Sequence, residues 1–252
     1  MFLAVTRIPD VPDALQRAAA ATGLVRADVQ RRLAGILPRV VLVDADRDEI
    51  QIAQRALEAA GFPAIAFDPS LAPTDEDRRF ARTLDLERDA MVVVSGVGAE
   101  TRERVPFEAV ALVQRALRSS TASRQVTTRE RKLALGTAIL TGGIKMTKTV
   151  ERTTTESTQT QESWLVLHRR DGGPDVVLAE RRLDYRFLGG TLQPASYANF
   201  EATVARIRAL LPRAPFDDRA SKPGFVAGLP ACSADPLDVA LFLIQLTHAG
   251  PQ

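Results

Sequence analysis

Val40-Val41-Leu42-Val43 is an unbroken apolar run, and Phe62–Phe67 is a second one. Apolar runs of this length predict buried strands. Between them, apolar side chains recur at helical spacing from Ile50 to Ala60, and Gly61 ends that pattern. The stretch therefore predicts a strand, then a helix that Asp48 caps, then a second strand.

The residues before this stretch add one strand and two helices. Residues 2–8 are mostly apolar and predict a strand, which Pro9 stops. Residues 13–21 and 26–34 predict helices, the first ended by Gly23. The order over residues 1–69 is then strand, helix, helix, strand, helix, strand.

Two stretches within residues 1–69 resemble parts of a known protein family. Ala21-Thr22-Gly23-Leu24, with Arg55-Ala56-Leu57-Glu58-Ala59-Ala60-Gly61 before an apolar strand, resembles the C-terminal domain of the bacterial ribosomal stalk protein. The resemblance covers about a quarter of the chain and implies that domain's fold. In that family, basic residues on the first two helices bind translation factors. The matching places here hold uncharged residues, namely Gln16, Ala19, Ala27 and Gln30. The resemblance therefore implies the fold without the family's activity.

A competing resemblance begins at Val40. Val40–Asp48 and Ala56–Phe62 also resemble the opening of a response-regulator receiver domain, in which paired acids bind Mg²⁺ and a later aspartate takes phosphate. Here the next apolar strand ends in Ser95, and no Lys-Pro signature follows. We therefore interpret Asp44 and Asp46 as turn acids that cap the following helix.

The second half of the chain is rich in strand patterns. Residues 80–86, 90–95 and 105–113 predict strands, and residues 164–169 and 176–183 predict a hairpin. Tyr197–Leu211 has apolar residues along one face and predicts an amphipathic helix. Several strands followed by one helix predict a roll or small barrel that the helix closes.

Part of this half also resembles a known family. Arg104-Val105-Pro106-Phe107-Glu108-Ala109-Val110, together with the later amphipathic helix, is similar in layout to bacterial pleckstrin-homology-like domains. That resemblance implies a module that binds a ligand or a protein and has no catalytic residues.

These patterns predict an α+β chain with two domains and a tail. The stalk-like domain spans 1–69, and the pleckstrin-homology-like domain spans 76–222 with an inserted basic β-arm at about 120–163. The tail, 223–252, contains a short helix at 236–247 that is apolar nearly all round. We expect that helix to dock on the body of the protein or on a partner.

Residues suited to catalysis or metal binding are scarce in the sequence. The only histidines are His168, which we place on a strand face, and His248, at the end of a helix. The single cysteine, Cys232, is interpreted as a small buried or semi-exposed residue. Gly136–Thr147 does not have the spacing of a phosphate-binding loop. We therefore expect no enzyme, no cofactor and no metal site.

Composition places the chain in the cytoplasm. One cysteine rules out an internal disulfide framework and fits a reducing compartment. The N-terminus does not resemble a signal peptide, and no apolar stretch is long enough to cross a membrane.

Positive charge is concentrated in the middle of the chain. Residues 111–150 contain eight basic residues and one acid, a formal charge of +7, whereas the whole chain carries +2. Within them, Leu133–Ile144 is uncharged and mostly apolar, and residues 147–163 are dominated by Thr, Ser and Gln. This pattern predicts a two-stranded arm with basic flanks and an apolar tip. Its candidate binding residues are Arg124, Arg129, Arg131, Lys132, Leu135, Ile139, Leu140, Ile144, Lys145 and Lys148.

Four interpretations of the arm remain open. It binds a partner protein or a second copy of the chain through the apolar tip, which is the preferred interpretation. Alternatively, it is a partly disordered loop or folds back on its own domain with its charge solvated, or it inserts into an anionic membrane as a peripheral adaptor. Nucleic-acid binding comes last, because no aromatic residues are interleaved for base stacking.

Overall fold

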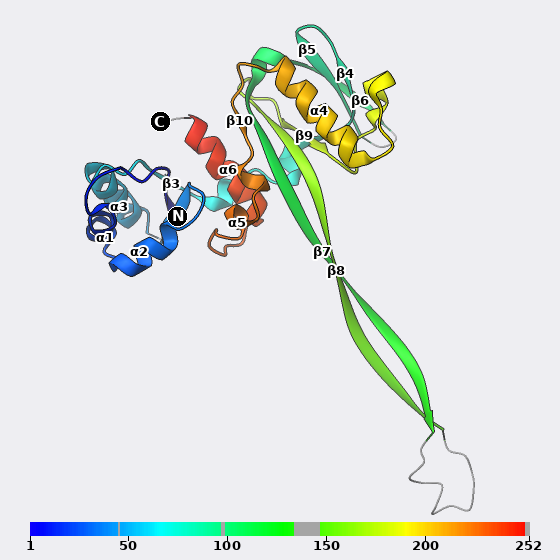
Figure 1. Ribbon diagram of the computed structural model, residues 1–252, viewed down its shortest axis with the longest axis horizontal. Coiled ribbons are helices and arrows are strands. Elements are labelled where there is room, and N and C mark those ends of the chain that lie inside the picture. Colours follow the sequence, from blue (N-terminus) through cyan, green and yellow to red (C-terminus); the bar gives the residue numbers. More distant parts are fainter. Residues whose placement is uncertain (45, 97–98, 134–146, 250–252) are drawn as a thin grey trace, which may run out of the picture. The chain divides into compact units, whose positions relative to one another are not determined.

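The computed structural model describes the backbone of residues 1–44, 46–96, 99–133 and 147–249. It describes their side chains except in 121–133 and 147–159. The chain divides into two compact units, which are Met1–Arg118 with Glu162–Gln252 (unit 1) and Ser119–Gln161 (unit 2). The fold is α+β, with a three-stranded sheet, a seven-stranded open sheet and helices (Figure 1).

The first part of unit 1 has the predicted order of elements. Its elements are β1 (Phe2–Val5), α1 (Ala14–Thr22), α2 (Arg26–Leu33), β2 (Arg39–Val43), α3 (Arg47–Ala59) and β3 (Ala64–Phe67). The strands form an antiparallel sheet in the order β2-β1-β3. One face of this sheet packs on the three helices, and Leu3, Ile50 and Leu57 lie in that core.

The start of α3 confirms that Asp44 and Asp46 are turn acids, but only Asp46 caps the helix. The Asp46 carboxylate accepts hydrogen bonds from the backbone N–H groups of Asp48 and Glu49, at 2.8 and 3.5 Å. Asp44 accepts from the N–H of Asp46 at 2.8 Å. The capping residue of α3 is thus Asp46, and the expectation that Asp48 caps it is wrong by two positions. Asp48 lies in the first turn, where its charge suits the helix dipole.

The second part of unit 1 is built on the seven-stranded sheet, with strand order β10-β7-β8-β9-β4-β5-β6. Its strands are β4 (Arg78–Leu86), β5 (Ala90–Ser95), β6 (Thr101–Pro106), β7 (Val110–Leu133), β8 (Thr147–Arg169), β9 (Asp175–Ala179) and β10 (Phe216–Asp217). Its helices are α4 (Ser196–Leu210), α5 (Pro223–Val226) and α6 (Pro236–Ala249). Neighbouring strands β4–β9 and β7–β10 are parallel, and pairs β4–β5, β5–β6 and β8–β9 are antiparallel.

Two strands of this sheet differ from their predicted bounds. The single strand expected over 105–113 is two strands, β6 and β7, separated by a 3₁₀ turn at Phe107–Ala109. Pro106 ends β6 because it has no N–H to donate to the sheet. The hairpin strand expected over 176–183 ends at Ala179. Residues after it turn away, and the Tyr185 hydroxyl donates to the Glu180 carbonyl at 2.7 Å.

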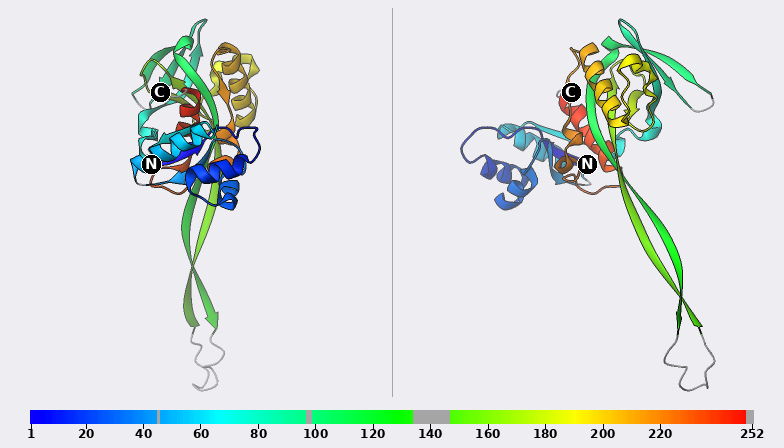
Figure 2. Two further views of the ribbon diagram at one scale, coloured as in Figure 1. Left: turned by 90° about the vertical axis from the view of Figure 1, so that its left-hand side faces the viewer. Right: turned by 45° about the vertical axis from the view of Figure 1, so that its right-hand side comes forward.

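The two faces of the seven-stranded sheet are covered by different helices (Figures 1 and 2). Because side chains alternate along a strand, successive residues of β8 enter different cores. Leu165 and Leu167 pack with Phe200 and Ile207 of α4. Trp164 and Val166 pack with α6, through a cluster that includes Leu237, Ala240, Leu241 and Ile244.

Helix α6 is buried on two opposite sides. Besides the seven-stranded sheet, it contacts the outer face of the three-stranded sheet, where Val239 and Leu243 pack with Phe2 and Phe67. Phe67 and Phe242 meet edge to face, with ring centroids 6.1 Å apart. The prediction that this apolar helix docks on the body is confirmed, and its position between two sheets explains why it is apolar nearly all round.

Candidate functional site

The predicted binding residues of the arm lie on β7 and β8 or between these strands. Arg124, Arg129, Arg131 and Lys132 belong to the backbone of β7, and Lys148 belongs to β8. Leu135, Ile139, Leu140, Ile144 and Lys145 lie outside the described residues. The two strands run side by side and twist about each other (Figure 1). Within unit 2, the hydroxyls of Ser120 and Thr160 are 2.7 Å apart.

The ends of β7 and β8 inside unit 1 are fixed by an aromatic cluster. The Trp164 ring is fully buried and meets Phe80 edge to face at 5.3 Å. The Arg118 guanidinium lies 4.6 Å from the centre of the Trp164 ring, a cation–π distance. Indole Nε1 of Trp164 donates to the Glu162 carboxylate at 3.1 Å.

Carboxylates of unit 1 neutralise two of the basic residues counted in the sequence. Arg118 lies 2.8 Å from Asp75 and 3.6 Å from Asp235. Arg115 donates to Glu201 of α4, at 3.1 Å for one of its two bonds. Unit 2 itself contains seven basic and three acidic residues, a formal charge of +4. The formal charge of unit 2 is therefore smaller than the +7 counted over residues 111–150.

Next to Arg118 lies a buried ion pair. The Arg78 side chain is 1 % exposed and donates to Asp238 of α6, which is 7 % exposed. Asp75 is the second carboxylate near Arg78, at 3.6 Å. Burial raises the pKa of Asp238, although the hydrogen bond from Arg78 opposes that rise. The pair connects β4 to α6.

His168 lies on strand β8, as predicted, and the structure adds that it is buried. Its Nδ1 lies 2.6 Å from Asp175 of β9, and the other oxygen of Asp175 accepts from the N–H of Arg169 at 3.0 Å. Its Nε2 has no hydrogen-bond partner among the described residues. The imidazole and carboxylate thus join β8 to β9, and no nucleophile from the described part of the chain bonds to the histidine.

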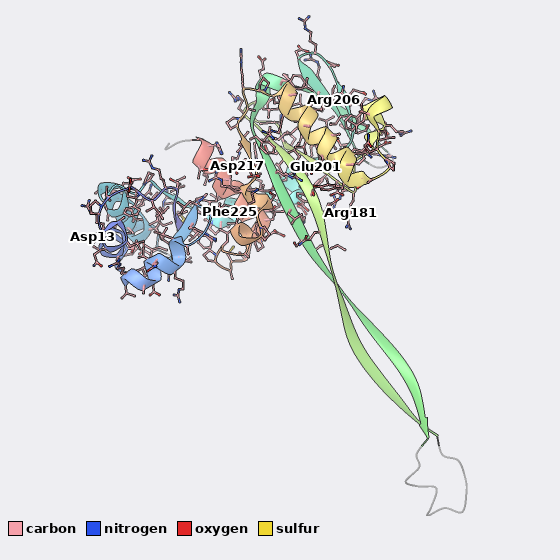
Figure 3. All side chains as sticks on the ribbon, in the orientation of Figure 1. Asp13, Arg181, Glu201, Arg206, Asp217 and Phe225 are labelled. Carbon is pink, nitrogen blue, oxygen red and sulfur yellow. The ribbon has the colours of Figure 1, made fainter. Side chains whose placement is uncertain are left out.

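Another carboxylate, Asp217 of β10, connects this strand to the end of α6. It accepts from Arg219 at 2.5–3.0 Å and lies 2.9 Å from Nε2 of His248, in the last turn of α6 (Figure 3). Burial alone would raise the pKa of Asp217, but the hydrogen bonds from Arg219 and His248 outweigh it, so the pKa is lowered. Arg219 also donates to the Leu37 carbonyl at 3.0 Å, which ties the segment to the three-stranded part.

The position of His248 at a helix end is as predicted, but the sequence pattern did not reveal its partner Asp217. The prediction for Cys232 is wrong, because this residue is exposed. It lies between α5 and α6 in a segment with no regular structure, where Gly228 and Pro230 interrupt any helix or strand. Its thiol faces solvent beside the Ala234 carbonyl, at 3.7 Å.

The residues that the structure describes hold no group of three or more His, Cys, Asp or Glu side chains placed to bind a metal ion. None of the helices described is long and apolar enough to cross a bilayer. Comparisons with protein-family models, curated proteins and solved structures found no match to this chain.

Proposed function

We propose that this chain is a non-enzymatic interaction module that binds a second copy of itself, or a partner protein, through residues 119–161. The observation that carries the proposal is the length of β7 and β8, which are 24 and 23 residues long. Strands in globular proteins are usually about 3–10 residues long. An isolated two-stranded hairpin is marginally stable in water, so a partner that covers it would stabilise it.

The edges of the two strands support this proposal. Strand β10 pairs with β7 only at Val113 and Gln114, and β9 pairs with β8 at Trp164–Leu167. Among the described strands, none pairs with the outer edge of either strand over 119–133 or 147–161. Free strand edges present unpaired N–H and C=O groups, which a strand from another molecule can pair with.

The two parts of unit 1 also have element orders that suit known binding folds. We propose a stalk-like fold for residues 1–69, supported by their order of elements, and a pleckstrin-homology-like origin for the second part, supported by its strands and by α4. Both suit a binding module. The single cysteine supports a cytoplasmic location.

The test replaces residues 124–156 with Asn-Gly, a pair that closes a hairpin tightly, so that most of the free strand edges and the segment between them are removed. Light scattering on size-exclusion fractions measures the mass of the full chain and of this variant over a range of concentrations. We expect the full chain to form a concentration-dependent oligomer, or a stoichiometric complex with one co-purified protein, and the variant to lose it. The charge variant Arg129→Ser/Arg131→Ser/Lys132→Ser is the matched comparison, because it keeps Leu133–Ile144 and should weaken association less than the replacement does.

Two outcomes would overturn the proposal. The first is a full chain that stays monomeric and captures the same proteins as the variant. The second is sedimentation with anionic vesicles that both the replacement and the charge variant abolish, which would assign the segment to a peripheral membrane adaptor instead.

A further inference from the structure

Arg39, the first residue of β2, is a buried arginine in an unusual setting. The residue is 7 % exposed, and its guanidinium lies between two glycines, Gly35 and Gly228. A Cβ atom on Gly228 would fall 1.4 Å from Nη1 of Arg39, so the guanidinium occupies the space that a side chain there would need. Nη2 donates to the Gly224 carbonyl at 2.9 Å.

The positive charge of Arg39 is not neutralised by a described side chain. No carboxylate from the described part of the protein lies within ion-pairing distance of it, and its Nε is buried without an acceptor. An arginine cannot lose its proton in a protein, and buried charges are normally paired. Arg78, a second deeply buried arginine, follows that rule through its pair with Asp238.

Arg39 lines a groove of about 460 Å³ that two other arginines share. Arg32 donates to the Val41 carbonyl at 2.5 Å, which satisfies a hydrogen bond but leaves its charge in place. Arg31 also lines the groove, but it pairs at 2.8 Å with Asp28, which is not part of the lining. The lining contains no acid, and its remaining side chains are mostly apolar, including Val40, Leu229 and Pro230.

We propose that this groove binds a phosphate monoester that carries an apolar group. The planar guanidinium of Arg39 would hold two oxygens of the phosphate, and Arg32 would supply the second positive charge. Val40, Leu229 and Pro230 would contact the apolar group, and the volume suits a small molecule. This site lies in unit 1 and does not depend on the interaction proposed for residues 119–161.

The sharpest variant is Gly228→Ala, which displaces the guanidinium without changing any charge. Arg39→Met removes the charge but keeps a long apolar side chain, and Arg32→Gln removes the second charge at an exposed position. Gly190→Ala is the matched control, because a Cβ atom there meets nothing within 4 Å. Circular dichroism and thermal unfolding in chloride check that each variant folds.

Isothermal titration calorimetry of the full chain with phenyl phosphate, at constant ionic strength, measures the affinity. We expect binding by the wild type and by Gly190→Ala, and a loss of about tenfold or more in Gly228→Ala and Arg39→Met. Arg32→Gln should lose less, and inorganic phosphate should bind the wild type more weakly than phenyl phosphate. Sedimentation with vesicles that contain phosphatidic acid tests whether the phosphate monoester is a lipid headgroup. A protein that binds these vesicles but not phenyl phosphate would assign the groove to a lipid headgroup.

Three results would overturn the proposal. A wild type that binds phenyl phosphate no better than chloride, and is not retained by the vesicles, would do so whatever the variants show. Equal affinity in wild type and in folded Arg39→Met would show that the charge is not recognised. Should both Arg39→Met and Gly228→Ala fail to fold, unchanged affinity in Arg32→Gln would count against the groove.

Discussion

Helices α4 and α6 have nearly the same length, 15 and 14 residues, and pack on opposite faces of the same sheet. Helix α4 has one buried face and a wet face that carries Arg206 and Arg208. Helix α6 is buried on two sides, because the three-stranded sheet covers the side that points away from the seven-stranded sheet. The difference shows how the sequence of a helix reflects its contacts. A helix that packs on one surface is amphipathic, whereas a helix that packs between two surfaces is apolar nearly all round.

The largest expected difference between the two helices concerns their ion pairs. Asp238→Ala on α6 leaves Arg78 buried without its main partner and should lower the free energy of unfolding by about 3–5 kcal/mol. Glu201→Ala on α4 breaks a partly exposed pair with Arg115 and should lower the free energy of unfolding by about 0–1 kcal/mol. Urea unfolding measures both.

A double replacement sharpens that prediction. Arg78→Met with Asp238→Leu should recover most of the lost stability, because no charge is then left unpaired. Equal losses for Asp238→Ala and Glu201→Ala would contradict the contrast between the helices.

The next effect concerns the two sides of each helix. On α6, Leu241→Ala and Leu243→Ala face different sheets, and each should cost about 2–5 kcal/mol. On α4, Ile207→Ala should cost a similar amount, whereas Arg206→Ala should change stability by less than about 0.5 kcal/mol. A negligible loss for Leu243→Ala, measured by urea unfolding, would mean that the three-stranded sheet does not stabilise α6.

The end of α6 introduces a dependence of the protein's stability on pH. Asp217→Asn weakens the bonds to Arg219 and His248 and should lower stability by about 2 kcal/mol at pH 7. The pKa of Asp217 is lowered in the folded state. Its contribution to the free energy of unfolding is therefore complete above the pKa of the unfolded state, and it is lost as pH falls through the pKa of the folded state. The difference between wild type and variant should therefore shrink below about pH 4. A difference that does not shrink below about pH 4 would contradict this account.

The smallest effects concern the N-termini of the helices. Asp235 accepts from the N–H of Leu237 at 2.8 Å at the start of α6, so Asp235→Ala should cost about 1 kcal/mol. Helix α4 begins after Ala195, which is exposed and offers no side-chain cap. Ala195→Ser should therefore raise the thermal midpoint by supplying about 0.5–1 kcal/mol, and a lower midpoint would contradict the prediction.

The elements that sequence predicted well are those with a strong local pattern. The strands around Val40–Val43 and Met91–Val94 and the helices at 14–22, 47–59 and 196–210 follow apolar periodicity, which acts within a few residues. Strand β10 was missed because two residues give no periodicity. The break at Phe107–Ala109 was missed although Pro106 marks it.

The groove at Arg39 could not be predicted in this way. Arg39 and the Gly224 carbonyl are 185 positions apart, and nothing near Arg39 in sequence indicates that Gly228 leaves room for its guanidinium. The same holds for Asp217 and His248, whose partnership depends on how α6 packs. For the arm, charge and composition predicted a binding segment, and its candidate residues stay a prediction.

The position of α6 has a consequence for how the protein is made. Both sheets precede α6 in the chain, so they leave the ribosome before the helix that fills the space between them. Until residues 236–249 emerge, Phe2 and Phe67 on one sheet and Trp164 and Val166 on the other have no helix to cover them. A nascent chain of this protein would therefore expose two apolar surfaces until residues 236–249 have emerged, and exposed apolar surface of this kind favours aggregation.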